Sequence, residues 1–321
     1  MNETRFRESE RRLWASVGVA PAEKHLRLDR TKATVRVQEV GEGQAVLFVH
    51  GASNGGTSWA GLAARLDGFR CVLLDRPGCG LSDRCATGFT DMATLGVFGD
   101  SLIVDVLDAL GLDCAHVVAT SFGGYFALRG AAAHPDRIGR AVELGWTFGA
   151  PIAKVPFVMR LSGMRLVRRL VTLIPPNERV VRAMLRQIGL AGALASGRFS
   201  QTDVDWYLAL LRDTNTLRNE LETSPRLITP LRGMNRSTLL PDDLLTQIRT
   251  PMHFLWGVDD PFGGPDIARA FVERVPKAGL ELMPGAGHAV WMDDPDRAAA
   301  SVRAFLGAGP GEPSPKRQAS R

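Results

Sequence analysis

The sequence is poor in long apolar runs. Residues 1–12 are rich in charge and lack the stretch of about 7–15 apolar residues that a secretory signal needs. The most apolar region, residues 156–175, is interrupted by four arginines, Arg160, Arg165, Arg168 and Arg169, so we expect no stable insertion into a membrane. These absences predict a cytoplasmic protein.

Cysteine is scarce as well. Only four of the 321 residues are cysteines (Cys71, Cys79, Cys85 and Cys114), and they form no C-x-x-C pair and no Cys/His metal spacing. Without a secretory signal we expect reduced thiols, including the neighbouring Cys79 and Cys85. We therefore predict no disulfide framework, no bound metal and no cofactor.

Neither sign of charge dominates, since 39 Lys and Arg against 34 Asp and Glu leave a net charge of +5. The distribution is uneven, because residues 146–200 hold a single acid, Glu178, and nine basic residues: Lys154, Arg160, Arg165, Arg168, Arg169, Arg179, Arg182, Arg186 and Arg198. No helix-turn-helix, zinc-finger or RNA-binding signature accompanies them, so we expect no nucleic-acid partner. A solvated helical face is the simplest interpretation, and recognition of negatively charged substrates is the alternative.

The order of the segments predicts the fold class. Hydrophobic residues make up 45% of the chain and charged residues 23%, as in globular proteins. Segments of strand length alternate with segments of helical periodicity. The predicted strands are 25–28, 33–39, 45–50, 70–75, 115–119, 140–144, 252–256 and 280–283, and the predicted helices are 57–66, 93–110, 122–134, 265–275 and 294–306. This order predicts an α/β fold with a mostly parallel, doubly wound sheet.

The alternation stops between Trp146 and Asp243, where no buried strand is evident and the apolar spacing is helical, as at Leu161, Leu166 and Val167. Such an insertion predicts a cap over the carboxyl edge of the sheet, where ligands bind in folds of this kind. The predicted organisation is an N-terminal extension (1–24), a core (25–145 and 241–306), a helical cap (146–240) and a disordered tail (307–321).

The sharpest chemical signal lies where a predicted strand meets a helix, in Val117-Val-Ala-Thr-Ser121-Phe-Gly-Gly124. A nucleophile elbow needs a serine at such a corner, with small residues two positions before and after it because the turn is tight. Ala119 and Gly123 occupy these two positions. A serine at this point is also a common helix N-cap, so the corner alone supports both interpretations.

A serine nucleophile needs a base that an acid orients. His288, one of six histidines, lies in the glycine-rich loop Pro284-Gly-Ala-Gly-His288, from which an imidazole can reach the sheet edge. Asp259 and Asp260 follow another predicted strand, and one of them is expected to initiate a turn because a proline comes next. Turn chemistry alone does not choose between the two aspartates.

Taken together, these stretches resemble the α/β-hydrolase family, and specifically its capped branch that acts on small molecules, over about residues 26–306. The matching stretches are His50-Gly51 with Ser58-Trp59, Asp75-Arg-Pro-Gly-Cys-Gly-Leu-Ser82, the corner at Ser121, Trp256-Gly257 with Asp260, and Gly287-His288. The resemblance implies that Ser121 attacks, His288 moves the proton and Asp260 orients the histidine, with Asp259 as the alternative acid. Ala119 departs from the usual G-x-S-x-G pattern of the elbow.

The same resemblance implies an oxyanion hole made by the backbone N–H groups of Phe122 and Ala52, with Ser53 as the alternative to Ala52. His50 is expected to be structural. Trp59 and Trp291 are expected to pack in the core, although both are candidates for lining the pocket.

A serine at the elbow argues against the haloalkane dehalogenases and epoxide hydrolases of this fold, which have aspartate there. Hydrolysis of esters, thioesters, lactones or amides, C–C bond hydrolysis as in meta-cleavage product hydrolases, and cofactor-free perhydrolysis remain. We therefore predict a serine hydrolase acting on a small organic substrate, a carboxylic ester or a related acyl or C–C bond. A non-catalytic ligand receptor or scaffold of the same fold is the alternative, and the oligomeric state stays open.

Overall fold

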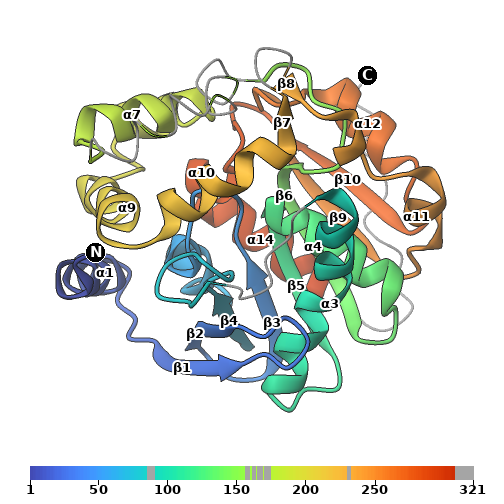
Figure 1. Ribbon diagram of the computed structural model, residues 1–321, viewed down its shortest axis with the longest axis horizontal. Coiled ribbons are helices and arrows are strands. Elements are labelled where there is room, and N and C mark those ends of the chain that lie inside the picture. The colour runs from blue at the N-terminus through green and yellow to red at the C-terminus, as the bar shows by residue number, and fades with distance from the viewer. Residues whose placement is uncertain are drawn as a thin grey trace.

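The computed structural model describes residues 1–84, 91–155, 175–229 and 233–307, together with residues 160, 164 and 169. Its centre is an eight-stranded sheet in the order β1-β2-β4-β3-β5-β6-β9-β10 (Figure 1). The strands are β1 (Ala22–Arg27), β2 (Thr34–Val40), β3 (Gln44–Val49), β4 (Phe69–Leu74), β5 (Ala115–Ser121), β6 (Ile138–Thr147), β9 (Met252–Gly257) and β10 (Ala278–Met283). β2 pairs antiparallel with β1 and β4, and the strands from β4 to β10 pair in parallel. The predicted α/β fold with a mostly parallel sheet is confirmed.

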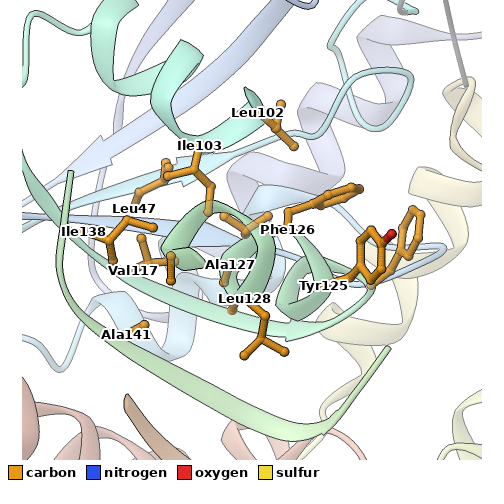
Figure 2. Packing of buried hydrophobic residues seen from close by; sticks show 14 of the residues in the cluster. Leu47, Leu102, Ile103, Val117, Tyr125, Phe126, Ala127, Leu128, Ile138 and Ala141 are labelled. Carbon is orange, nitrogen blue, oxygen red and sulfur yellow. The ribbon is translucent and has the colours of Figure 1, made fainter. Parts of the chain in front are cut away.

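Helices cover both faces of the sheet (Figure 1). One face carries α3 (Met92–Ala109), α4 (Phe122–Ala133), α11 (Asp242–Gln247) and α12 (Pro265–Val272), and the other carries α2 (Ala60–Ala63), α13 (Val290–Asp293) and α14 (Pro295–Leu306). Figure 2 shows Phe126 and Leu128 of α4 in a cluster with Leu47, Val117 and Ile103. Strands buried on both faces explain the continuous apolar runs of the sequence.

The predicted helix over residues 57–66 is shorter than expected. A 3-10 turn, η1 (Gly56–Trp59), leads directly into the single turn of α2. The Gly56 N–H donates to Asp75 Oδ1 over 2.7 Å, which fixes the start of this segment to the loop after β4.

Between β6 and β9 the chain forms α7 (Glu178–Gln187), α8 (Ala191–Ser196), α9 (Gln201–Asp213), α10 (Thr216–Leu227), the 3-10 turn η2 (Arg236–Thr238) and a small hairpin of β7 (Ile228–Thr229) and β8 (Gly233–Met234). The hairpin corrects the expectation that residues 146–243 hold no buried strand, because Ile228 is buried. Strands of two residues are too short to produce a periodic pattern. β6 also runs on to Thr147, beyond the predicted end of its strand at residue 144.

These helices lie over the carboxyl ends of the strands. The Gly80 N–H, in the loop after β4, donates to Thr216 Oγ1 of α10 (2.9 Å), and the His288 N–H donates to Ile188 O, just after α7 (3.0 Å). Leu161, Leu166 and Val167, which carry the predicted helical spacing, lie outside the described residues, as do Cys85, Arg165, Arg168 and residues 308–321 of the predicted tail.

The predicted N-terminal extension contains an ordered helix, α1 (Glu3–Ser16), and β1 already begins at Ala22. Phe6, Leu13 and Trp14 of α1 are buried. The helix packs against α9, where the Asn2 N–H donates to Asp213 O over 3.0 Å. The apolar face of this helix is difficult to see in the sequence, because it consists of three large side chains among many charged residues.

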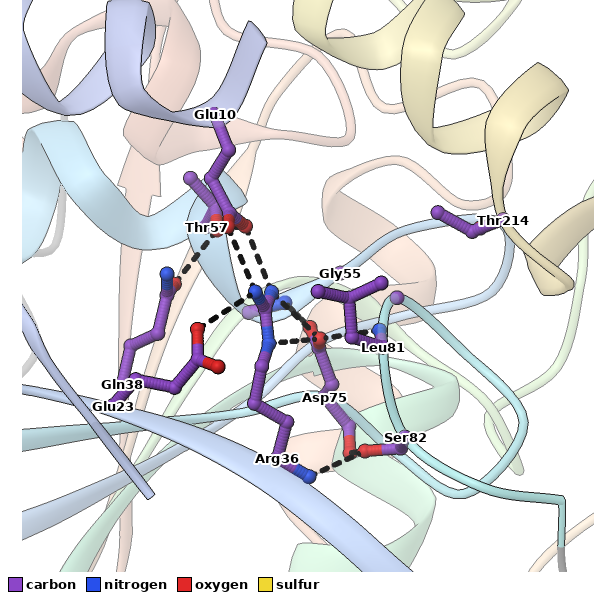
Figure 3. A network of polar contacts seen from close by, with 12 residues as sticks. Glu10, Glu23, Arg36, Gln38, Gly55, Thr57, Asp75, Leu81, Ser82 and Thr214 are labelled. Atoms are coloured by element: carbon purple, nitrogen blue, oxygen red, sulfur yellow. Dashed lines mark hydrogen bonds and ion pairs between the residues drawn. The ribbon is translucent and has the colours of Figure 1, made fainter. Parts of the chain in front are cut away.

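A buried polar network joins α1 to the sheet (Figure 3). Arg36 of β2 is 1% exposed and donates to both Glu10 oxygens (2.7 Å each) and to Asp75 Oδ2 (2.8 Å from Nε). Burial opposes its charge, but Asp75 and Glu10 raise the pKa of Arg36, so it stays ionised. Ser82 Oγ, which accepts from the Arg36 N–H, donates to Asp75 O (2.6 Å). The Asp75–Ser82 stretch is therefore folded around this ion pair.

Candidate active site

Ser121 lies at the corner between β5 and α4 with φ 52° and ψ −121°. This backbone conformation is unfavourable for a residue with a side chain and costs about 1–3 kcal/mol. Ser121 occupies the N-cap position of α4, but its hydroxyl makes no capping hydrogen bond to the helix. A Cβ at Gly123 would lie 2.1 Å from Val49 O, so only glycine allows α4 to approach β3 this closely. The fold thus holds a strained serine at the carboxyl edge of the sheet.

His288 and Asp260 meet at the same edge, with His288 Nδ1 2.9 Å from Asp260 Oδ2. Asp260 Oδ2 also accepts the Trp146 N–H at the end of β6 (2.8 Å), and two residues later Phe148 N–H donates to Ser121 O (3.0 Å). The structure therefore brings the three predicted residues to one place. Within the described part of the chain no hydrogen bond joins Ser121 Oγ to His288, a contact that often forms only when substrate binds.

The structure separates the two candidate aspartates. The Asp260 side chain is fully buried, and its Oδ1 accepts the Phe262 N–H over 2.9 Å. Asp259 is exposed. Only Asp260 contacts the histidine, because it points into the protein where Asp259 points to solvent.

Aromatic rings shield the imidazole from water. The His288 ring lies 4.5 Å from the Phe262 ring and 6.2 Å from the Trp146 ring, measured between centroids. The His288 side chain is only 9% exposed. The ring is therefore largely buried between these aromatic side chains.

The two predicted oxyanion donors flank the serine. Phe122 is the first residue of α4 and is buried, whereas Ala52 is exposed and follows β3. A Cβ on Gly51 would lie 2.9 Å from Ser121 Cβ, so the loop that carries Ala52 touches the corner. Ser53, the alternative donor, is next in this loop and has φ 51°.

His50 has the structural role expected of it. It is fully buried, its Nδ1 lies 2.8 Å from Gly51 O, and its Nε2 accepts the Arg76 N–H over 3.1 Å. Burial and the nearby Arg76 charge lower the His50 pKa well below its usual value. The ring is therefore neutral, with its proton on Nδ1.

Trp59 and Trp291 are confirmed as core residues. They are 0% and 4% exposed, and their rings lie 4.3 Å apart. Trp291 Nε1 donates to Ser58 O over 3.1 Å, so the second tryptophan fastens the segment after His288 to η1.

Two buried acids near the site escaped the sequence analysis. Asp293 Oδ2 accepts the N–H of Gly287, the residue before His288, over 2.8 Å, and burial raises the pKa of Asp293 to about 6. Glu143 of β6 lies beneath α4, where a Cβ on Gly124 would be 2.2 Å from its Oε2. Burial raises the Glu143 pKa well above its usual value. An acid in the middle of an apolar strand is the signal that marks Glu143 in the sequence.

Most of the predicted basic cluster faces solvent. Lys154, Arg169, Arg179, Arg186 and Arg198 are exposed, whereas Arg182 pairs with Glu178 over 2.7 Å. The thiol of Cys79 is free.

Among the described residues, no group of three or more His, Cys, Asp or Glu side chains can hold a metal ion. No helix of this part of the chain has the length and apolarity to cross a membrane.

Known proteins resemble this chain in sequence and in fold. The sequence profile of the alpha/beta hydrolase family matches residues 46–301. A 2-hydroxy-6-oxononadienedioate/2-hydroxy-6-oxononatrienedioate hydrolase of Burkholderia vietnamiensis is 28% identical over 286 residues, which cover 87% of this chain and 92% of the relative. A protein of Caulobacter sp. (strain K31) to which carbamate hydrolysis is ascribed is 31% identical over 274 residues, which cover 82% of this chain and 90% of the relative.

A solved structure has the same fold. The 2-hydroxy-6-oxo-6-phenylhexa-2,4-dienoate hydrolase from Rhodococcus sp. strain RHA1 matches with a TM-score of 0.73 at 18% identity, covering 90% of this chain and all (100%) of that one. The fold and these matches define a hydrolytic enzyme built on a mostly parallel sheet. The chain belongs to the alpha/beta hydrolase family.

Proposed function

We propose that this enzyme is a serine hydrolase in which Ser121, His288 and Asp260 form the catalytic triad. The observation that carries the proposal is the conformation of Ser121, which has φ 52° and a hydroxyl that does not cap the following helix. A fold gains nothing in stability from a strained serine that caps nothing, whereas a nucleophile has to be presented in this way. The contact between His288 Nδ1 and Asp260 Oδ2 (2.9 Å) supports the roles of base and orienting acid.

In the proposed mechanism His288 Nε2 removes the proton of Ser121 as Oγ attacks a substrate carbonyl carbon. Asp260 keeps the other imidazole proton on Nδ1 and stabilises the imidazolium that forms. The N–H groups of Phe122 and Ala52 donate to the oxyanion, a contribution of about 3–4 kcal/mol for each donor. His288 then protonates the leaving group, and water releases the acyl group from Ser121 by the same steps.

The substrate that we propose is a small organic molecule with an ester or a carbonyl-activated C–C bond, because both bonds are cleaved after attack on a carbonyl. The relative from Burkholderia vietnamiensis, which covers most of this chain, is named for hydrolysis of a dienedioate, a molecule with two carboxylates. This name favours the C–C class as the second candidate beside simple esters.

Residues 146–240 are proposed to act as a cap, with the basic segment favouring substrates that bear a negative group. The exposed arginines of this segment support attraction at long range, which weakens as the ionic strength rises. We expect kcat/KM for a carboxylate-bearing ester to fall more than kcat/KM for its neutral analogue between about 0.02 and 0.5 M salt. An equal response of both esters would leave the segment with no part in recognition.

The function is tested with a panel of p-nitrophenyl esters, lactones and ring-cleaved dienoates, each assayed with the wild type and with Ser121→Ala. We expect Ser121→Ala to lose activity by a factor on the order of 10⁶ without loss of fold. A fluorophosphonate probe should label the wild type at Ser121 and leave the variant unlabelled. A variant that keeps more than a few per cent of the activity would disprove the triad.

A further inference from the structure

Arg76 is a buried arginine in the loop after β4, and three of its hydrogen bonds go to the loop after β3. Its side chain is 5% exposed. Nε donates to His50 O over 2.9 Å and NH2 donates to Gly51 O over 2.8 Å, while its backbone N–H donates to His50 Nε2 over 3.1 Å. Three hydrogen bonds from one residue therefore hold two consecutive residues, His50 and Gly51.

The bond to Gly51 O also fixes the direction of the next N–H group. A trans peptide is planar, and its C=O and N–H groups point in opposite directions. Because the Gly51 carbonyl points to Arg76, the Ala52 N–H points to the other side of the same peptide plane. Gly51 itself touches Ser121, so the orientation of this plane decides where the Ala52 N–H lies relative to the serine.

The same guanidinium contacts the second proposed donor. The Arg76 Cζ lies 5.0 Å from the centre of the Phe122 ring and 5.8 Å from that of Phe126. A cation over an aromatic face at such distances is attractive, and more strongly so when buried. Arg76 thus fastens the first turn of α4 and the loop after β3 to one rigid group.

A helix of the 146–240 segment supplies the counter-charge. Glu220 of α10 accepts from Arg76 NH2 over 2.9 Å, and this is the nitrogen that also donates to Gly51 O. The two side chains are 5% and 12% exposed. An unbalanced guanidinium would be costly at this depth, so the position of Arg76 depends on α10 remaining in place.

We propose that Arg76 is a positioning residue that sets the oxyanion hole, and that Glu220 makes this setting depend on the docking of α10 over the site. The inference rests on the proposed function, since it concerns the two N–H groups that would stabilise the oxyanion of that reaction. In this role Arg76 acts through the two N–H groups and not on the substrate itself. Its effect belongs to the transition state, because only there does the substrate oxygen carry the charge that these donors stabilise.

The test compares Arg76→Met, Arg76→Lys and Glu220→Gln with a matched control, Arg129→Met. Arg129 of α4 also forms an ion pair, with Asp100 (2.8 Å), and also lies over an aromatic ring, Tyr125 (5.7 Å), but it fastens α4 to α3 and not to the loop after β3. Each protein is assayed for kcat and KM on one ester, for inhibition by phenylboronic acid, which forms a tetrahedral adduct on serine, and for inhibition by the carboxylic acid product.

We expect Arg76→Met to lower kcat and the affinity for phenylboronic acid by the same factor, about 10- to 100-fold, because displacement of a catalytic group by about 1 Å has this effect. KM and product affinity should stay within about twofold of the wild type. Arg76→Lys and Glu220→Gln should show the same pattern with smaller losses, and Arg129→Met should keep wild-type kcat and boronate affinity. If Arg76→Met does not fold, the two milder variants carry the test.

Two results would overturn the inference. One is a variant set with unchanged kcat and boronate affinity, and the other is an equal loss of boronate and product affinity, which indicates general damage to the site. Fluorophosphonate labelling of Ser121 in the same preparations separates this failure from failure of the proposed function. If the wild type is labelled and the Arg76 variants keep wild-type kcat and boronate affinity, the positioning role alone is disproved. If the wild type is not labelled at Ser121, the proposed function and this inference are disproved together.

Discussion

Replacing Asp260 by asparagine tests the proposed role of its buried carboxylate, because the two side chains differ only in that an NH2 group replaces one oxygen. Oδ2 of Asp260 serves His288 Nδ1 and the Trp146 N–H, and Oδ1 serves the Phe262 N–H, all at 2.8–2.9 Å. Asparagine has one oxygen, so one of these two positions must hold an NH2 group that faces a backbone donor. An unsatisfied buried donor costs about 1–3 kcal/mol, which we expect to see as a lower free energy of unfolding.

The effect on catalysis should be larger than the effect on stability. Loss of the carboxylate removes the partner of the imidazolium and lets the ring adopt the wrong tautomer. For triad acids this typically lowers kcat on the order of 10⁴-fold, which corresponds to about 5 kcal/mol of transition-state stabilisation.

The neighbouring aspartate provides the control. Asp259 is exposed and does not contact His288, so Asp259→Asn should stay within about threefold of wild-type kcat and within about 0.5 kcal/mol in stability. Stopped-flow assays on one verified ester and urea unfolding give both numbers for each variant. The assignment would be refuted if Asp259→Asn lost most of its kcat, or if the kcat of Asp260→Asn stayed within tenfold of the wild type.

Three further predictions concern stability. Ser121→Gly should be more stable than Ser121→Ala by about 1 kcal/mol in urea unfolding, because glycine adopts a positive φ without strain; equal midpoints would argue against strain at the corner. Glu10→Gln should cost about 2 kcal/mol, because an amide NH2 would face the buried Arg36 guanidinium in place of a carboxylate oxygen, although Asp75 still balances the charge. Glu8→Gln, whose partner is an exposed arginine, should cost less than about 0.5 kcal/mol. Burial raises the pKa of Asp293 to about 6, so its proton is held in the folded state and lost in the unfolded state between about pH 4 and 6. The stability that this proton contributes is complete below about pH 4 and disappears as the pH rises to 6, whereas asparagine does not titrate. The unfolding free energy of the wild type minus that of Asp293→Asn should therefore become more negative over this range; a flat difference would contradict the shift.

The sequence alone was sufficient to predict the eight strands of the central sheet and its longer helices α3, α4, α12 and α14, whereas the short helices α11 and α13 were not predicted. Buried parallel strands need continuous apolar runs, and the helices between them need a 3.6-residue period, so both leave a local pattern. The corner at Ser121 could be predicted for the same reason, because a tight strand-to-helix turn allows only small residues two positions before and after the serine. Short elements such as β7 and β8 (residues 228–229 and 233–234) left no pattern.

Only the tertiary structure showed which of Asp259 and Asp260 contacts His288. Both follow the same strand and have the same chemistry, and only the packing of β6 and the loop of His288 buries one of them. Helix α1 was concealed for a related reason, since its charged residues find their partners in β2 and α9.

The pairing of Arg76 with Glu220 could not be foreseen from either residue. They are 144 residues apart, and each lies in a segment whose local pattern is complete without the other. A buried guanidinium needs a counter-charge, but a sequence does not say which distant acid the fold will bring to it. The sequence by itself predicted which residues would carry the chemistry at the sheet edge. The tertiary structure decided which charged groups meet behind them, because hydrogen bonds and ion pairs depend on distance in space and not along the chain.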